Sequence, residues 1–240
     1  MSTPLDSITD TLVSDCADLA FAPPVTHVYQ PLVYAREGWD QYCARFGHGR
    51  RDVLVVGMNP GPYGMAQVGV PFGEVGFVRD WLGIRAPIQQ PPRVHPKRPI
   101  HGFACRRREV SGQRFWGWAQ ATCATPERFF AQFFVTNYCP LVFMSASGAN
   151  VTPDKLPFAE RALLIAACDR ALLATVAHFR PRWVLGVGHF AELRLRSALA
   201  AWPSVVIGRV PHPSPASPIA NAGWAPLMTA ALLELDVPLP

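Results

Sequence analysis

Three polar side chains in this sequence each follow an apolar run and lie in a loop rich in glycine or proline. Asn59 lies in GMNPGPYGMAQVGVPFGEV (residues 57–75), Asn137 in FFVTNYCPL (133–141) and His212 in HPSPASPIANAGW (212–224). The amide of Asn137 offers one acceptor and two donors, which suits an N–H beside a C=O on one edge of a base. The imidazole of His212 could stabilise charge on a bound molecule.

The first of these loops combines a rigid path with an apolar face. Its glycines and prolines bring backbone N–H groups and Asn59 toward a ligand, while Phe72 offers a flat ring. A generic loop of this composition is more often a structural turn. So long an apolar loop directly after a buried strand is uncommon unless it builds a site, which favours function here.

Prolines at positions 213, 215 and 218 remove most of the freedom of the loop after His212. A single histidine is more often structural. Here a rigid loop at a strand end would preorganise the imidazole, which favours a catalytic role. Asn137, taken alone, is the kind of residue that caps a turn.

A third pattern, G-x-G-x-x-A, is formed by Gly186, Gly188 and Ala191. It has the form of a dinucleotide fingerprint, which requires an acidic residue about 20 positions later. Residues 193–233 contain no Asp or Glu, so the cofactor interpretation is weak. We therefore expect Gly186 and Gly188 to present backbone N–H groups and a helix N-terminus to a nucleic-acid phosphate.

The elements that position these loops alternate between strands and helices. Apolar runs indicate four strands at residues 52–57, 133–137, 183–188 and 205–210. Helical patterns cover residues 74–82, 114–122, 159–179, 190–200 and 225–235, and residues 87–112 form a long excursion without periodicity. This alternation predicts an α/β fold with a parallel sheet and helices on both faces, whose ligands bind at the carboxyl ends of the strands.

Composition restricts the class of protein. The 240 residues are 50% hydrophobic and 16% charged, which excludes a disordered chain and suits a single domain over residues 1–240. The longest purely apolar stretch is residues 162–168, so we expect no membrane span, and the lack of Lys and Arg in residues 1–35 predicts no secretory signal and an intracellular protein. The net charge is +5, and beyond residue 35 there are 22 basic and 13 acidic side chains, which makes a polyanionic partner plausible.

Six cysteines lie at positions 16, 43, 105, 123, 139 and 168 and include no C-x-x-C pair. The spacing indicates neither a zinc ribbon nor an iron–sulfur loop. We expect reduced thiols and no metal.

Taken together, the three loops resemble those of the single-strand-selective monofunctional uracil-DNA glycosylases, a branch of the uracil-DNA glycosylase superfamily. The resemblance extends to VRDWLGI (78–84), HPKRP (95–99), EVSGQRFWG (109–117) and NVTPDKLP (150–157). It covers about residues 25–235 in the family's order and leaves residues 1–24 as an acidic N-terminal segment.

The resemblance implies a three-layer α/β/α sandwich around a four-stranded, mostly parallel sheet. It also implies a reaction without metal or cofactor, in which uracil or an oxidised uracil such as 5-hydroxymethyluracil is flipped out of single- or double-stranded DNA and its N-glycosidic bond is hydrolysed, leaving an abasic site. The expected protein is a base-excision-repair enzyme, a monomer that acts in the cytoplasm or nucleoid of a bacterium or in a eukaryotic nucleus.

The resemblance also assigns roles to residues. Asn59 positions water, His212 stabilises the leaving base, Phe72 stacks on the base and Asn137 reads its edge. Further pocket positions are Met58, Gly61 and Met65, the last through its backbone. The DNA-binding segments correspond to residues 147–161 and to the loop that holds Pro213, Ser214, Pro215, Ala216, Ser217 and Asn221.

Two alternatives stay open from the sequence. One is an iron–sulfur uracil-DNA glycosylase of the same superfamily, which the cysteine spacing disfavours. The other is a non-catalytic nucleic-acid-binding module, although a stacking ring, an edge-reading amide and a rigidly held histidine are more than backbone binding requires. The sequence also departs from many relatives, which have Arg and Lys where this chain has Ala216 and Ala222.

Overall fold

Four parallel strands form the central sheet of the computed structural model, which describes residues 4–239. The strands are β2 (Val53–Gly57), β3 (Phe133–Asn137), β6 (Trp183–Val187) and β7 (Val206–Val210), in the order β3-β2-β6-β7. Every residue of β2 and β6 is buried, as their continuous apolar runs predict for strands covered on both faces. The four predicted strands are confirmed, and every neighbouring pair is parallel.

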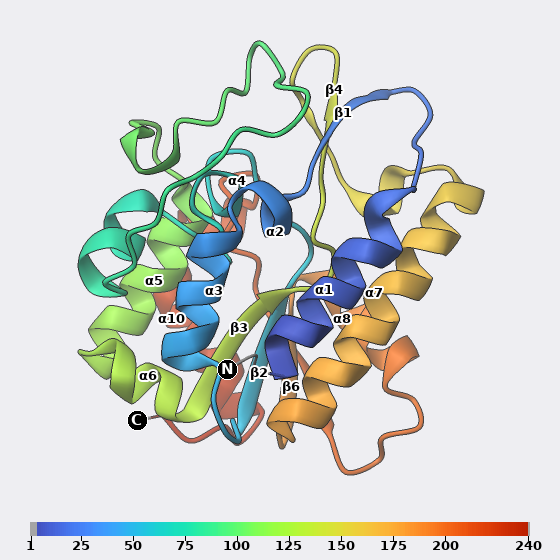
Figure 1. Cartoon of the computed structure of the whole chain (residues 1–240). Helices are drawn as coiled ribbons and strands as arrows, with labels where there is room; N and C mark the ends of the chain where they lie inside the picture. Colours follow the sequence, from blue (N-terminus) through green and yellow to red (C-terminus); the bar gives the residue numbers. More distant parts are fainter. Residues whose placement is uncertain (1–3, 240) are drawn as a thin grey trace.

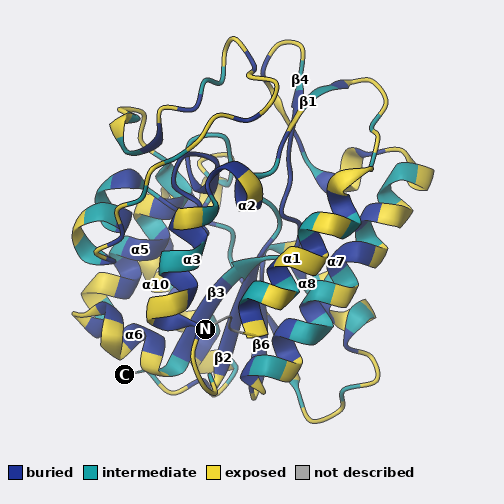
Figure 2. Ribbon diagram, in the orientation of Figure 1, coloured by how far each residue is buried: buried dark blue, intermediate teal, exposed yellow. Residues whose placement is uncertain are grey.

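Helices cover both faces of this sheet, so the three-layer α/β/α architecture is confirmed (Figure 1). One layer contains α3 (Arg36–Phe46), α5 (Val110–Cys123), α6 (Pro126–Gln132) and α10 (Trp224–Glu234), and the other contains α1 (Pro4–Ala17), α7 (Phe158–Phe179) and α8 (His189–Ala198). The sheet and the inner helix faces form the buried core, and the exposed residues lie on the outer helix faces and loops (Figure 2).

The structure also contains a second sheet, so the sequence-based prediction of four strands was incomplete. It is antiparallel, in the order β1-β4-β5, and consists of β1 (Val25–Tyr29), β4 (Val142–Ser145) and β5 (Asn150–Val151). These strands are short, and β1 has polar residues inside it, so neither a long apolar run nor clean alternation marks them. The sheet matters for function because it carries the loop at residues 147–152 toward the end of the central sheet.

Short helical turns complete the loops: α2 (Pro31–Tyr34), α4 (Met65–Val68) and α9 (Pro218–Asn221). The helix expected at residues 74–82 is reduced to a π-helical turn, Phe77–Trp81. The excursion at residues 87–112 contains one short 3-10 helix, Gly102–Ala104, before α5 begins at Val110. A further 3-10 helix occupies Pro153–Lys155.

The N-terminal segment is an integral part of the fold. Helix α1 packs along α7 and buries Leu5, Thr9 and Leu12. Within the described residues, α7 is the one helix long and apolar enough to cross a membrane by length and composition. Its buried side chains, among them Leu164 and Val176, join the core cluster, so its apolarity is explained by its position between α1 and the sheet.

Candidate active site

The three loops identified from the sequence meet at the carboxyl ends of β2, β3 and β7 and enclose a cavity of about 290 Å³. Nine of the predicted site residues line it: Met58, Asn59, Gly61, Met65, Phe72, Asn137, His212, Ser214 and Pro215. Pro213, Ala216, Ser217 and Asn221 lie in the same loop as His212 without lining the cavity. Parallel strands end at one edge of a sheet, which is why loops far apart in sequence converge here.

The ring of His212 is fixed by the backbone of its own loop. The N–H of Ser214 donates to Nδ1 of His212 at 3.0 Å. Because Nδ1 accepts this bond, the ring proton of the neutral imidazole lies on Nε2. Burial lowers the pKa of His212 below its usual value near 6.5, since the charged ring would lose its hydration. At neutral pH the site therefore holds an uncharged histidine with one remaining N–H to donate.

Two glycines of the G-x-G-x-x-A pattern have packing roles. A Cβ on Gly188, whose φ is +83°, would lie 3.3 Å from Cβ and Cδ2 of His212, so the glycine lets the histidine sit against the end of β6. Gly186 is buried, and its Cβ would lie 2.3 Å from the backbone N of Glu192 in α8. Gly186 thus permits close strand–helix packing, and neither glycine lines the cavity. Their expected contact with a nucleic-acid phosphate stays a prediction.

Arg114, on α5, holds the loop that carries His212. Its Nη1 donates to the carbonyl oxygens of Pro213 and Ser214 at 2.9 and 3.3 Å, and its Nη2 donates to Oδ1 of Asn221 at 2.8 Å. The Asn221 amide in turn donates to the Pro215 carbonyl at 2.9 Å. Sequence analysis gave Arg114 no role, and its position inside the EVSGQRFWG motif was the signal that pointed to it.

Asn59 has its amide orientation set by backbone carbonyls. Its Nδ2 donates to the carbonyl of Leu141 at 3.0 Å and to that of Pro60 at 3.4 Å. With both amide protons directed at protein, Oδ1 is the atom left for a ligand. An acceptor at this point can orient a water molecule but is too weakly basic to remove its proton.

Phe72 is held in a strained backbone conformation beside the base-reading position. Its φ is +52°, which is rare for a residue with a Cβ and recurs at functional sites. One face of its ring stacks on Phe115, with centroids 4.9 Å apart and an interplanar angle of 13°. A Cβ on Gly57 would lie 2.3 Å from Oδ1 of Asn137 and 2.9 Å from Cζ of Phe72, so this glycine lets both side chains meet at the end of β2.

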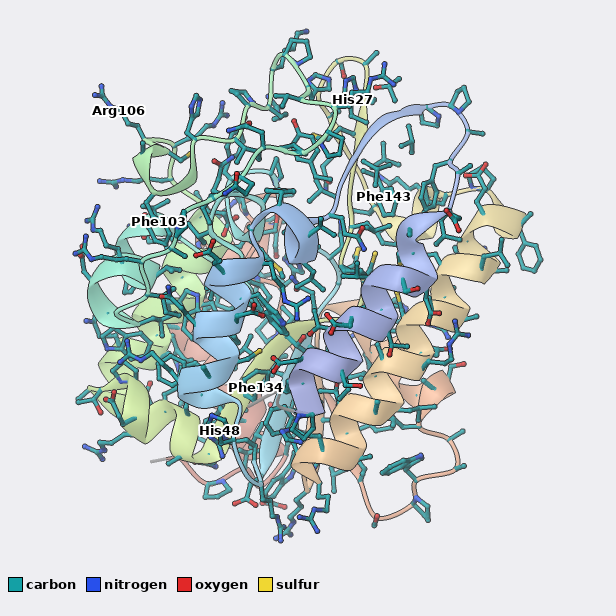
Figure 3. All side chains as sticks on the ribbon, in the orientation of Figure 1. His27, His48, Phe103, Arg106, Phe134 and Phe143 are labelled. Carbon is teal, nitrogen blue, oxygen red and sulfur yellow. The ribbon has the colours of Figure 1, made fainter. Side chains whose placement is uncertain are left out.

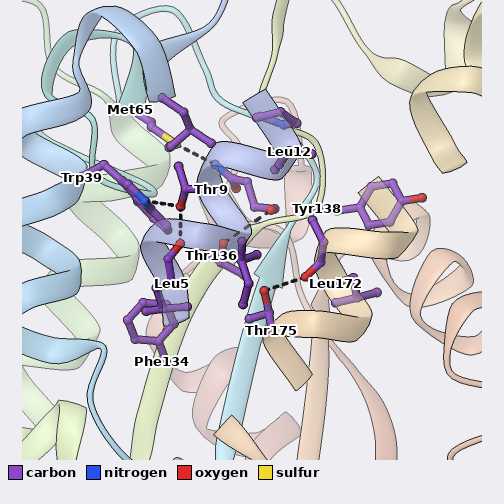
Figure 4. A pocket seen from close by; sticks show the side chains of 15 residues that line it. Leu5, Thr9, Leu12, Trp39, Met65, Phe134, Thr136, Tyr138, Leu172 and Thr175 are labelled. Carbon is purple, nitrogen blue, oxygen red and sulfur yellow. Dashed lines mark hydrogen bonds between the residues drawn. The ribbon is translucent and has the colours of Figure 1, made fainter. Parts of the chain in front are cut away.

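Asn137 is the last residue of β3, and its Nδ2 donates to Sδ of Met65 at 3.3 Å. The same two residues also line a small space of about 40 Å³ beneath α1 (Figure 4). There Trp39 Nε1 donates to Thr9 Oγ1 at 2.8 Å and ties α1 to α3. The side chains at the floor of the cavity are thus backed by the N-terminal helix, and Met65 contributes its sulfur as well as its backbone.

Several lining residues carry polar groups that sequence analysis did not place in the base pocket. They are Glu109, Ser111, Asn150 and Thr152. Glu109 caps α5 by accepting from the backbone N–H groups of Ser111 and Gly112, and burial raises its pKa although these bonds oppose the rise. Asn150 and Thr152 belong to the segment that the resemblance associated with DNA.

The cysteines do not converge on this site. Five of the six are buried, and burial raises the pKa of the Cys16 thiol to about 12. Between residues 4 and 239, no group of three or more His, Cys, Asp or Glu side chains is placed to hold a metal ion. Apart from Glu109, the polar side chains that line the cavity are amides, hydroxyls and the imidazole of His212.

Comparison with known proteins places this geometry in a family. The model of the uracil DNA glycosylase superfamily matches residues 45–228, which include every loop that lines the cavity. The chain belongs to this superfamily. The single-strand selective monofunctional uracil DNA glycosylases of Mus musculus and Bos taurus are each 48% identical to it over 227 residues, covering 94% of this chain and 81% and 84% of theirs.

A solved structure supports the fold of this glycosylase-superfamily chain. The crystal structure of wild-type Pedobacter heparinus SMUG2 superposes with a TM-score of 0.67, covering 95% of this chain and 97% of that one, at 15% identity. The three-layer architecture is therefore shared well beyond recognisable sequence similarity.

Proposed function

We propose that this protein is a monofunctional DNA glycosylase of base-excision repair that hydrolyses the N-glycosidic bond of uracil and of oxidised uracils in single- and double-stranded DNA. One observation carries the proposal. A neutral histidine donor, an amide acceptor, a stacking ring and a second amide converge on one cavity that is large enough for a base and opens at the carboxyl ends of the strands.

The geometry favours a path in which the glycosidic bond breaks before water attacks. Oδ1 of Asn59 can hold a water molecule near the sugar but cannot readily take its proton, so the leaving base must carry negative charge as it departs. Nε2–H of His212 is the donor suited to the base oxygen O2, where that charge accumulates. A preorganised donor of this kind is typically worth about 100- to 1000-fold in rate.

A flipped base would be enclosed between Phe72 and the far cavity wall, with its edge toward Asn137. Extrusion from a duplex costs a few kcal/mol and least for an unpaired base. Gly61 lines the cavity, and nothing lies within 4 Å of where its Cβ would be, which leaves room beside the base for a substituent such as hydroxymethyl.

Quantifying free base by chromatography tests the proposed substrates. We expect release of uracil and 5-hydroxymethyluracil from a single-stranded oligonucleotide and no release of cytosine. Borohydride should trap no covalent complex, because no lysine lines the described cavity to form a Schiff base. Absence of free base, or a trapped complex, would contradict the proposal.

Asn137→Asp should depress uracil excision by about 10-fold or more, because one buried hydrogen bond left unpaired costs roughly 1–3 kcal/mol. The substitution replaces the amide donor, now directed at Met65, by a carboxylate oxygen. Cytosine presents the opposite donor and acceptor pattern on this edge, so the variant can gain cytosine excision. Single-turnover rates on both bases measure this, and unchanged uracil activity would remove Asn137 from the base pocket.

Ala216→Arg should raise activity on duplex DNA more than on single-stranded DNA. Ala216 is exposed, and its methyl group can neither fill the site of an extruded base nor contact a phosphate. We expect the unmodified protein to prefer single-stranded uracil, then a U·G pair, then U·A. Rates on these three substrates, before and after the substitution, check the expectation.

Equal rates on all three substrates, or no duplex-specific gain in Ala216→Arg, would indicate that a neighbouring residue fills the gap that the extruded base leaves in the duplex. The structure offers Ile219 on α9, whose side chain is 66% exposed although it is apolar.

We further propose that the protein acts as a monomer in whichever cellular compartment contains the DNA. The molecular mass in solution, measured by light scattering during gel filtration, tests the monomer directly.

A further inference from the structure

A second hollow, of about 470 Å³, lies next to the active-site cavity. Tyr63 lines it, and the residues on either side of Tyr63, Pro62 and Gly64, line the active-site cavity. The other side chains with polar or charged ends are Lys97, His101, Arg106 and Arg107. We call this hollow the Tyr63 groove. Arg106, at its rim, extends from the loop into solvent (Figure 3).

The ring of Tyr63 contacts two guanidinium groups, that of Arg107, which lines the groove, and that of Arg98, which does not line it. Cζ of Arg107 lies 4.4 Å and Cζ of Arg98 lies 5.4 Å from the centroid of the Tyr63 ring, within the range of cation–π attraction. Such a contact orients a guanidinium while leaving its N–H groups free to donate. Nε of Arg98 is buried and has no hydrogen-bond partner among the described residues.

The positive charge of the groove is not compensated by protein. No Asp or Glu is among the residues that line it. Over the described residues, neither Lys97, Arg98, Arg106 nor Arg107 forms an ion pair, whereas Arg36, Arg194 and Arg196 elsewhere are paired with carboxylates. Guanidiniums kept close together without a carboxylate favour an anionic ligand with several oxygen acceptors, such as a phosphodiester.

We propose that the Tyr63 groove is a subsite for the DNA backbone, which binds phosphates of the strand next to the flipped nucleotide. The inference rests on the proposed function, because it takes the neighbouring cavity to hold one nucleotide of that strand. Between them, residues 62–64 of the protein line the active-site cavity and the Tyr63 groove, so a DNA strand that places one base in the cavity passes the groove. The groove contributes affinity for a strand and takes no part in bond cleavage.

Substitution of both exposed arginines tests the subsite. In Arg106→Gln/Arg107→Gln, the Kd for uracil-free single-stranded DNA should rise about 10-fold, and the slope of log Kd against log salt should fall by about 1.4, the value for two lost phosphate contacts on a single strand. Fluorescence anisotropy measures both quantities. The single-turnover excision rate at saturating enzyme should change less than about 2-fold, because binding energy lost equally in ground and transition states leaves that rate unaltered.

A matched control removes the same charge from the opposite end of the molecule. Arg180 and Arg182 line another basic hollow, just before β6 begins. Arg180→Gln/Arg182→Gln should alter the Kd less than about 2-fold if binding at the groove is local. Equal weakening in both double variants would overturn the subsite in favour of general charge attraction, and no weakening in Arg106→Gln/Arg107→Gln would overturn it outright.

The role of the ring is tested separately by Tyr63→Leu and Tyr63→Phe. Leucine removes the cation–π contact and should weaken strand binding several-fold, whereas phenylalanine keeps the ring and should bind normally. Equal affinity of the two variants would show that the ring does not organise the guanidiniums. These affinity measurements are distinguishable from a failure of the proposed glycosylase function. In that case the wild-type protein would release no free base, whatever its affinity for DNA.

Discussion

His212→Ala should lower the single-turnover rate of uracil excision by about 100- to 1000-fold, because it removes a preorganised donor that would stabilise the departing base. The fold should persist, since the loop is also held by Arg114 and by the bond from Trp224 Nε1 to the Pro211 carbonyl at 2.8 Å. Rapid-quench kinetics at saturating enzyme measure the loss, and an unchanged melting temperature is the control. A rate within about 5-fold of wild type would contradict the assignment.

The neutral form of His212 gives the pH dependence a definite sign. Burial depresses the pKa of His212 below 6.5, so the ring is uncharged at neutral pH and gains a proton only in acid. Protonation would place a second N–H on Nδ1, opposite the N–H of Ser214, and break the bond that orients the ring. The excision rate should therefore be level above about pH 6.5 and fall as the pH drops through the depressed pKa. The same group makes the folded state less stable in acid, because the unfolded chain binds the proton more readily.

Asn59→Ala should lower excision by at least about 100-fold, because the attacking water loses its acceptor and its position. Asn150→Ala is a matched control: Asn150 also lines the cavity but is itself exposed, on β5, and its loss should alter the rate less than about 10-fold. The same single-turnover assay serves both. If the two variants lose activity equally, Asn59 has no special role in placing water.

The central sheet and the principal loops could be predicted from sequence for a physical reason. Strands β2 and β6 are buried on both faces and therefore appear as uninterrupted apolar runs, and parallel strands must place their following loops at one edge. Asn59, Asn137 and His212 came from that argument combined with the family resemblance. What the resemblance added was the role of each residue.

Other features depend on contacts that no local pattern encodes. The tautomer of His212 follows from the backbone N–H of Ser214, and Arg114 acts over a separation of 99 residues from Pro213. The β1-β4-β5 sheet pairs β1 with β4, two short strands more than 100 residues apart, and Gly186 is required by the backbone of α8, which packs against it. In each case the partner in space, and not the neighbour in sequence, decides the role.

A gel assay on a 5′-labelled single-stranded oligonucleotide with one uracil tests the central claim most directly. Base excision without strand cleavage predicts an intact strand after reaction with the protein and a single cut at the uracil position after alkali. The Asn59→Ala/His212→Ala double variant should leave the strand alkali-resistant. An alkali-resistant strand after reaction with the wild-type protein, or a cut that appears without alkali, would contradict the assignment of this cavity to monofunctional uracil excision.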